Sequence, residues 1–128
     1  MTYKELKEIL WSVHDRFTYT SDISQFGKPE HWMSFDEIPE GRFSGDCDDF
    51  AQAIRKEVSK VGGSSRLAVC GVNSDTLNHA VALVDCSDGI TYICDNIHKW
   101  PMRKSELATY KFISVSGYET GDPWREII

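Results

Sequence analysis

The sequence feature that most constrains the fold is a cysteine at the start of a predicted helix, in segment 45–51 (GDCDDFA). Apolar residues recur after it at spacings of three and four, which predicts an amphipathic helix with one buried face. That face consists of Cys47, Phe50, Ala51, Ile54, Val58 and Val61. Gly62 and Gly63 predict where the helix ends, because glycine adopts the left-handed backbone of a helix terminus.

The rest of the chain changes from helical to strand-like patterning. A capping box at Thr2–Glu5 predicts a first helix, residues 18–33 are expected to be irregular, and a short helical turn is expected near Ser105. Strands are predicted near residues 65–72, 79–86, 90–95 and 110–116. Helices followed by sequential strands predict an α+β fold in one domain, residues 1–128, with an antiparallel sheet packed on the central helix.

Three residues in this framework are candidates for nucleophilic catalysis. Cys47 lies in the first turn of its helix, where the helix dipole favours thiolate over thiol. The hairpin turn signal Asp88-Gly89 would bring His79 and Asp95 to one edge of the sheet, with a register offset of a few residues. A thiol, a base and a group that orients the base form the arrangement that activates a cysteine. The alternative is that Cys47 is a small buried core residue.

The remaining cysteines and histidines suggest structural roles. Cys70, Cys86 and Cys94 lie in strand-like surroundings and are expected to be reduced, with a Cys86–Cys94 disulfide across the hairpin as the alternative. The spacing of cysteines and histidines does not match that of a zinc site. Surface or structural positions are expected for the histidines without comparable partners, which are His14, His31 and His98.

The order of these motifs resembles that of the bacterial transglutaminase-like cysteine peptidases, over roughly residues 5 to 118. The matching segments are 45–51, 79–81 and 95–96, with Phe17, Tyr19, Asp22, Gly27, Trp32, Glu37 and Gly41 upstream. The resemblance implies a papain/transglutaminase-like core with catalytic Cys47, His79 and Asp95. It also implies a calcium site formed by acidic residues that flank the cysteine, here Asp46 and Asp48.

The acidic residues around Cys47 also have a simpler interpretation. Asp48 and Asp49 complement the helix dipole, each contributing about 0.3–1 kcal/mol. Like charges so close to Cys47 raise the pKa of a thiol, and a calcium ion held by Asp46 and Asp48 would cancel that effect.

The predicted chemistry is acyl transfer through a thioester, with no cofactor needed for the reaction itself. His79 takes the thiol proton, Asp95 orients His79, and the Cys47 N–H supplies one oxyanion donor. Trp32 is the candidate second donor, with a packing role as its alternative. Water as acceptor gives a peptidase or amidohydrolase acting on a protein or peptide. A protein-glutamine acyltransferase, a peptidoglycan amidase and a non-catalytic binding module are the alternatives.

Composition narrows the range of partners. The net charge of −6 argues against nucleic acid and anionic membranes. The sequence contains no apolar run as long as a membrane span, and a monomer is expected. The N-terminus opens directly into a helix pattern, so a cytoplasmic protein is expected as encoded, and a periplasmic one if a signal was removed.

Overall fold

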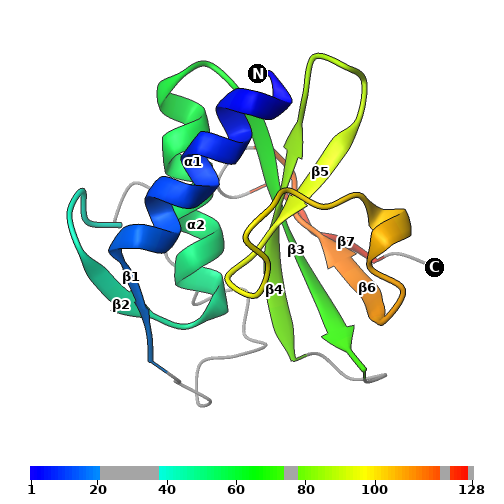
Figure 1. Ribbon diagram of the computed structural model, residues 1–128. Coiled ribbons are helices and arrows are strands. Elements are labelled where there is room, and N and C mark those ends of the chain that lie inside the picture. The colour runs from blue at the N-terminus through cyan, green and yellow to red at the C-terminus, as the bar shows by residue number, and fades with distance from the viewer. Residues whose placement is uncertain (21–37, 74–77, 119–121, 127–128) are drawn as a thin grey trace.

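Two helices pack on one face of a five-stranded sheet, and a small two-stranded sheet lies beside them (Figure 1). The computed structural model describes residues 1–20, 38–73, 78–118 and 122–126. The elements are α1 (Tyr3–Arg16), β1 (Phe17–Tyr19), β2 (Phe43–Gly45), α2 (Cys47–Lys60), β3 (Ser64–Val72), β4 (His79–Asp85), β5 (Thr91–Cys94), η4 (Lys104–Glu106), β6 (Tyr110–Val115) and β7 (Arg125–Glu126). The larger sheet has the order β5-β4-β3-β6-β7 with antiparallel neighbours throughout. The predicted α+β fold, with the cysteine helix on an antiparallel sheet, is confirmed.

Both helices form where the sequence signals indicate. At the start of α1, the Thr2 hydroxyl accepts the Glu5 N–H (3.1 Å), and the Glu5 carboxylate accepts the Thr2 N–H (2.9 Å). At the end of α2, Gly62 adopts a φ of 78°, which glycine tolerates without strain. The two helices and the sheet share a core of fully buried side chains that includes Leu6, Leu10, Phe50, Ile54 and Val84. The helices of the described residues are too short and too polar to cross a membrane.

The β4–β5 hairpin sets the position of two candidate catalytic residues. Asp85 pairs with Thr91 and Ala82 pairs with Cys94, while Gly89 in the turn has a φ of 83°. Asp95 directly follows β5 and therefore lies near the start of β4, where His79 is the first residue.

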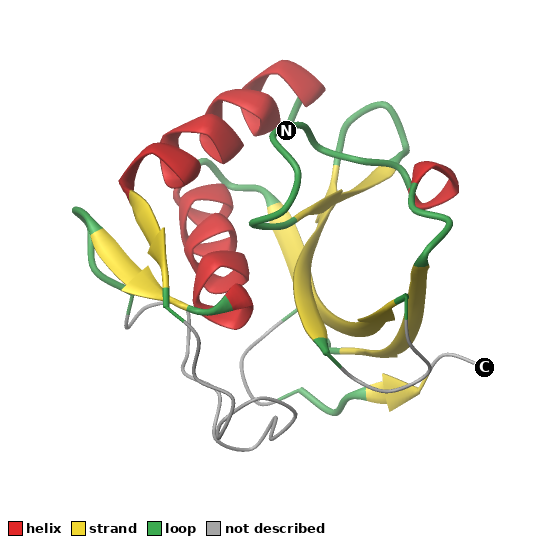
Figure 2. Cartoon of the chain, turned by 60° about the horizontal axis from the view of Figure 1, so that its bottom comes forward, coloured by secondary structure: helices red, strands yellow, loops and turns green. Residues whose placement is uncertain are grey.

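The sheet curls strongly (Figure 2). One face packs on the helices, and the other lines a concave surface, here called the trough, whose buried residues include Ala68, Cys70, Val81, Ile93 and Tyr110. In the pairing of β3 with β6, Val69 lies opposite Ser114 and Cys70 lies opposite Phe112, so Ile113 forms a bulge in β6. This bulge accompanies the curvature of the sheet.

The structure also differs from the expectations in three places. Phe17–Tyr19 forms β1, paired in parallel with β2, where an irregular segment was expected from residue 18. The two-residue strand β7 was not predicted, because strands this short carry too few residues for a periodic pattern. All four cysteines are free thiols, so the Cys86–Cys94 disulfide alternative is wrong. The hairpin register pairs Cys94 with Ala82 instead.

Candidate active site

Cys47 is the first residue of α2 and is fixed by contacts with the sheet. Its Sγ accepts a hydrogen bond from the N–H of Ala80 at 3.4 Å, and its side chain packs with Val69 and Ala80. Only 4% of Cys47 is exposed. The helix start thus lies directly against β4, beside the residue that follows His79.

The local sequence before Cys47 is fitted to this helix start. The carboxylate of Asp49 accepts a hydrogen bond from the N–H of Asp46 at 3.1 Å. A Cβ on Gly45 would lie 2.2 Å from Asp49 Oδ2, so only glycine leaves room for this contact. The contact satisfies a backbone donor at the helix N-terminus.

Burial controls the protonation of the Cys47 thiol. It raises the pKa of Cys47 to about 11, although the N–H groups of Ala80, Cys47 and Asp48 act in the opposite direction. The charge of Asp49 raises it further. The N–H groups at the helix start do favour the thiolate, as expected, but desolvation outweighs them, so the pKa of Cys47 is raised. A thiol with this pKa needs a base to remove its proton.

His79 and Asp95 form a buried hydrogen-bonded pair. Nε2 of His79 lies 2.9 Å from Oδ2 of Asp95, and these residues are 5% and 1% exposed. With Nε2 engaged by the carboxylate, Nδ1 is the ring nitrogen left to exchange a proton with another group. This is the geometry of a base held by an orienting carboxylate.

Asp95 binds more partners than the sequence suggested. The hydroxyl of Tyr110 donates a hydrogen bond to Oδ2, and Oδ1 accepts N–H groups from Ile97 (3.2 Å) and His98 (2.9 Å). The ring nitrogen Nδ1 of His98 lies 3.1 Å from the same Oδ1. Burial alone would raise the pKa of Asp95, but the hydrogen bonds from His79 and Tyr110 outweigh it and lower the pKa to about 2. The carboxylate is therefore ionised at any physiological pH.

Sequence reasoning missed Tyr110 and the partner of His98. His98 was expected to lack a partner comparable to that of His79, but it shares the Asp95 carboxylate with His79. The ring of Tyr110 also packs edge-on against His79, with centroids 5.6 Å apart and an interplanar angle of 90°. The separation of three residues between Asp95 and His98 was the available signal, since an aspartate after a strand commonly caps the following turn. No comparable signal pointed to Tyr110.

Of the other histidines, His14 supports the same loop, because its Nε2 lies 2.8 Å from the carbonyl oxygen of His98. His31 lies outside the described residues, as does Trp32, so the predicted second oxyanion donor stays a prediction.

The thiol and the imidazole face a common space. A hollow of about 380 Å3 is lined by Tyr19, Cys47, Val72, Asn78, His79, Asn96 and Ile97. Of these residues, Tyr19 and Ile97 are more than half exposed, whereas Cys47 and His79 are buried. Such a hollow suits a polypeptide segment whose carbonyl must approach a buried sulfur.

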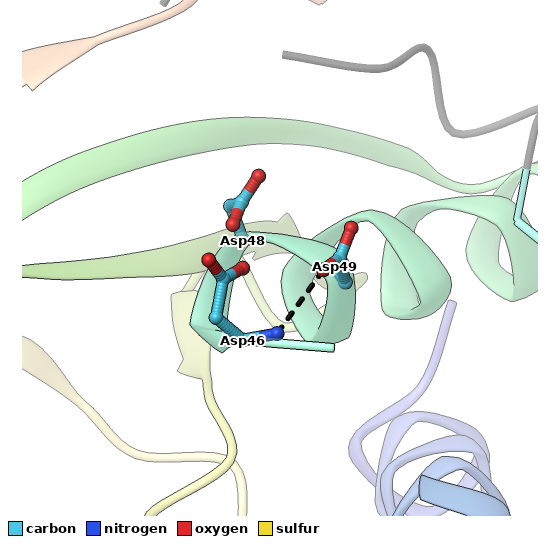
Figure 3. Close-up of side chains that lie close together, drawn as sticks. All are labelled: Asp46, Asp48 and Asp49. Atoms are coloured by element: carbon cyan, nitrogen blue, oxygen red, sulfur yellow. Dashed lines mark hydrogen bonds between the residues drawn. The ribbon is translucent and has the colours of Figure 1, made fainter. Parts of the chain in front are cut away.

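Three aspartates surround the start of α2 (Figure 3). One carboxylate oxygen from each of Asp46, Asp48 and Asp49 lies within 4.8 Å of the others. Oδ1 of Asp46 is buried and has no hydrogen-bond partner among the residues that the structure describes. A buried carboxylate oxygen without a donor, next to two more carboxylates, fits the hard oxygen ligands that calcium prefers.

The whole chain, residues 1–128, matches the family model described as bacterial transglutaminase-like cysteine proteinase. The chain belongs to this family. A search of curated proteins found no match.

Solved structures of Legionella pneumophila LapG share the fold. LapG is 21% identical with a TM-score of 0.68, and the match covers 91% of this chain and 64% of LapG. Its EGTA-treated form is 20% identical with a TM-score of 0.68, covering 97% and 72% of the two chains. Its calcium-bound form is 22% identical with a TM-score of 0.69, covering 91% and 66%. The chain thus spans about two thirds of the length of LapG.

Proposed function

We propose that this protein is a cysteine peptidase that hydrolyses an amide bond of a protein or peptide substrate. In this proposal Cys47 is the nucleophile, His79 the general base and Asp95 the residue that orients His79. The observation that carries it is the shared hollow of Cys47 and His79, combined with the 2.9 Å hydrogen bond from His79 to Asp95. Membership of a cysteine proteinase family supports the same reaction.

The reaction starts from the thiol, because burial keeps the pKa of Cys47 high. As Sγ attacks the substrate carbonyl carbon, Nδ1 of His79 takes the thiol proton and Asp95 stabilises the imidazolium. His79 then gives this proton to the leaving amine, which departs as the C–N bond breaks and a thioester forms. Water then attacks the thioester carbonyl while His79 takes its proton. The C–S bond breaks and His79 returns this proton to Sγ, which releases the acid and the free thiol.

Charge develops on the carbonyl oxygen during both steps. The backbone N–H of Cys47, at the N-terminus of α2, is one donor for this oxyanion. A side-chain donor from Trp32 remains the proposed second one.

We further propose that Asp46, Asp48 and Asp49 bind calcium. LapG has calcium-bound and EGTA-treated structures, and the buried oxygen of Asp46 supports a cation here. A bound ion would offset the negative charge of Asp49 beside the Cys47 thiol. Calcium should raise the midpoint of thermal unfolding, and EGTA should reverse this. Asp46→Asn should weaken the effect, whereas the exposed Asp15→Asn should not.

The peptidase proposal is tested with a peptide library derived from a bacterial proteome and analysed by mass spectrometry. The intact protein should create new peptide termini, and Cys47→Ala should create none. Cys86→Ala is the matched control, since Cys86 is a half-buried thiol away from the hollow. Cleavage that survives in Cys47→Ala would overturn the proposal.

Hydrolysis and transamidation are separated in the same assay. A biotinylated primary amine is added, and the products are examined for free carboxylates or for the attached amine. We expect free carboxylates. Predominant incorporation of the amine at glutamine side chains would assign the chain to the acyltransferase alternative.

A further inference from the structure

A second hollow, of about 440 Å3, opens in the trough at the end away from the catalytic residues. In the pairing of β3 with β4, Arg66 lies opposite Leu83, whereas His79 lies opposite Cys70 near the other end of β3. The hollow is lined by Arg66, Leu83, Thr91, Ile93, Lys104, Phe112, Val115 and Arg125. Among the described residues, it shares no lining residue with the hollow that contains Cys47 and His79.

The floor of this second hollow is apolar. Leu83, Ile93, Phe112 and Val115 come from three strands, and the bulge in β6 lets Phe112 and Val115 face the same side. A concave apolar surface with a few polar groups is typical of a binding site.

Three cations border this floor, and none of its lining residues that the structure describes is acidic. Arg66, Lys104 and Arg125 form no ion pair with any carboxylate of the described part of the chain. The Arg66 guanidinium lies 4.9 Å from the ring centroid of Tyr118, and Lys104 Nζ lies 5.9 Å from that of Phe112. In a chain with a net charge of −6, such a group of unpaired cations is unexpected.

The side chain of Arg66 also contains an unsatisfied hydrogen-bond donor. Its Nε is buried and has no hydrogen-bond partner in the described part of the chain. Within the described residues, Asp85 hydrogen-bonds to the hydroxyls of Thr91 and Tyr118, at 2.8 Å each, and not to this Nε. A buried donor without an acceptor is destabilising, and an incoming carboxylate that draws the guanidinium toward it would relieve this.

We propose that this hollow is a docking site for a peptide segment that carries acidic and apolar side chains. The cations come from three separate elements, β3, η4 and β7, so an extended ligand with several carboxylates pairs with them better than a single anionic group. The apolar side chains of the same segment would cover Leu83, Ile93 and Phe112. The proposal does not depend on the catalytic chemistry, because the site lies apart from Cys47.

The test is binding of a twelve-residue peptide of alternating glutamate and leucine or phenylalanine, measured by calorimetry and by amide chemical shifts. The Cys47→Ala protein is used, so that the probe stays intact whether or not the chain is a peptidase. A peptide with lysine in place of every glutamate is the charge control. Binding of the acidic peptide should shift the amides of Leu83, Ile93 and Phe112, and should weaken as salt is raised.

Substitutions locate the interaction. Arg66→Gln and Arg125→Gln should each weaken binding about fivefold, as expected for one partly exposed ion pair. Arg42→Gln is the matched control, because Arg42 is an exposed arginine outside the trough and should leave the affinity unchanged.

Four results would overturn the proposal. The first is that the acidic peptide does not bind at millimolar concentration, and the second is that the lysine peptide binds equally well. The third is an affinity for the acidic peptide that Arg66→Gln does not change. The fourth is that decanoate binds in the hollow and the peptide does not. The last result would assign the site to a small anionic amphiphile.

Discussion

The hydroxyl of Tyr110 donates a hydrogen bond to Asp95 Oδ2, the same oxygen that lies 2.9 Å from His79 Nε2. Tyr110 is on β6, which is separated from β5 by two strands in the order of the sheet. The contact exists because the sheet curls into a trough (Figure 2), which brings residues of β5 and β6 into one buried cluster. Asp95 is therefore held from both sides of the trough.

Removing this hydroxyl should weaken catalysis. In Tyr110→Phe we expect kcat/KM for a cleaved peptide to fall about tenfold, because a hydrogen bond to a charged group contributes about 1.5 kcal/mol. Tyr92→Phe is the matched control, since the Tyr92 hydroxyl also binds a carboxylate, that of Asp88 (2.7 Å), but far from the hollow. Equal activity of the two variants would show that Tyr110 does not position Asp95.

The reactivity of the cysteines should reveal the base. Iodoacetamide should modify Cys47 in a reaction that depends on His79, because the pKa of Cys47 is too high for spontaneous ionisation. In His79→Ala, modification of Cys47 should slow at least tenfold. Cys86 is an internal control, since it is half-buried and outside the hollow, so its rate should stay unchanged. Mass spectrometry of the modified peptides measures both rates, and a parallel change at both cysteines would contradict the role of His79.

The helix of Cys47 and the β4–β5 hairpin could be predicted because each has a strong local signal. The apolar spacing after Cys47 predicted the helix, which ends at Lys60, one residue before the expected end. The turn signal at Asp88-Gly89 predicted the hairpin, and the hairpin in turn predicted that Asp95 approaches His79. These contacts depend on residues close in sequence, or on one turn between regular strands.

The missed features depend on packing between distant segments. Tyr110 reaches Asp95 only because of the curl of the sheet, and no periodicity in residues 110–115 encodes that curvature. The high pKa of Cys47 likewise follows from how completely β4 covers the thiol, which no sequence pattern measures.

Gly45 offers a test of the helix start. In Gly45→Ala the new Cβ would lie 2.2 Å from Asp49 Oδ2 and displace this carboxylate from the N–H of Asp46. We expect the free energy of unfolding to fall by about 1–2 kcal/mol, since a helix cap would be lost. Gly41→Ala is the control, because its Cβ would meet no atom of a described residue within 4 Å. Chemical denaturation measures both, and equal stability of the two variants would contradict the close approach at Gly45.

Because of Asp95, the free energy of unfolding should depend on pH in the acid range. Its pKa is about 2 in the folded chain, whereas an unfolded aspartate titrates near about 3.9. Because the folded value is the lower one, the ionised carboxylate stabilises the fold above about pH 4, and this contribution is lost as the pH falls toward 2. The shift corresponds to about 2 kcal/mol.

The free energy of unfolding of the wild type should therefore fall between pH 5 and pH 2 by about 2 kcal/mol more than that of Asp95→Asn, which has no group to titrate at this position. Tyr110→Phe should lie between the two, because the Tyr110 hydroxyl is one of the donors that lower the pKa of Asp95. Urea denaturation at a series of pH values gives the three curves. Parallel curves for the wild type and Asp95→Asn would mean that the hydrogen bonds from His79 and Tyr110 do not hold this carboxylate ionised in solution.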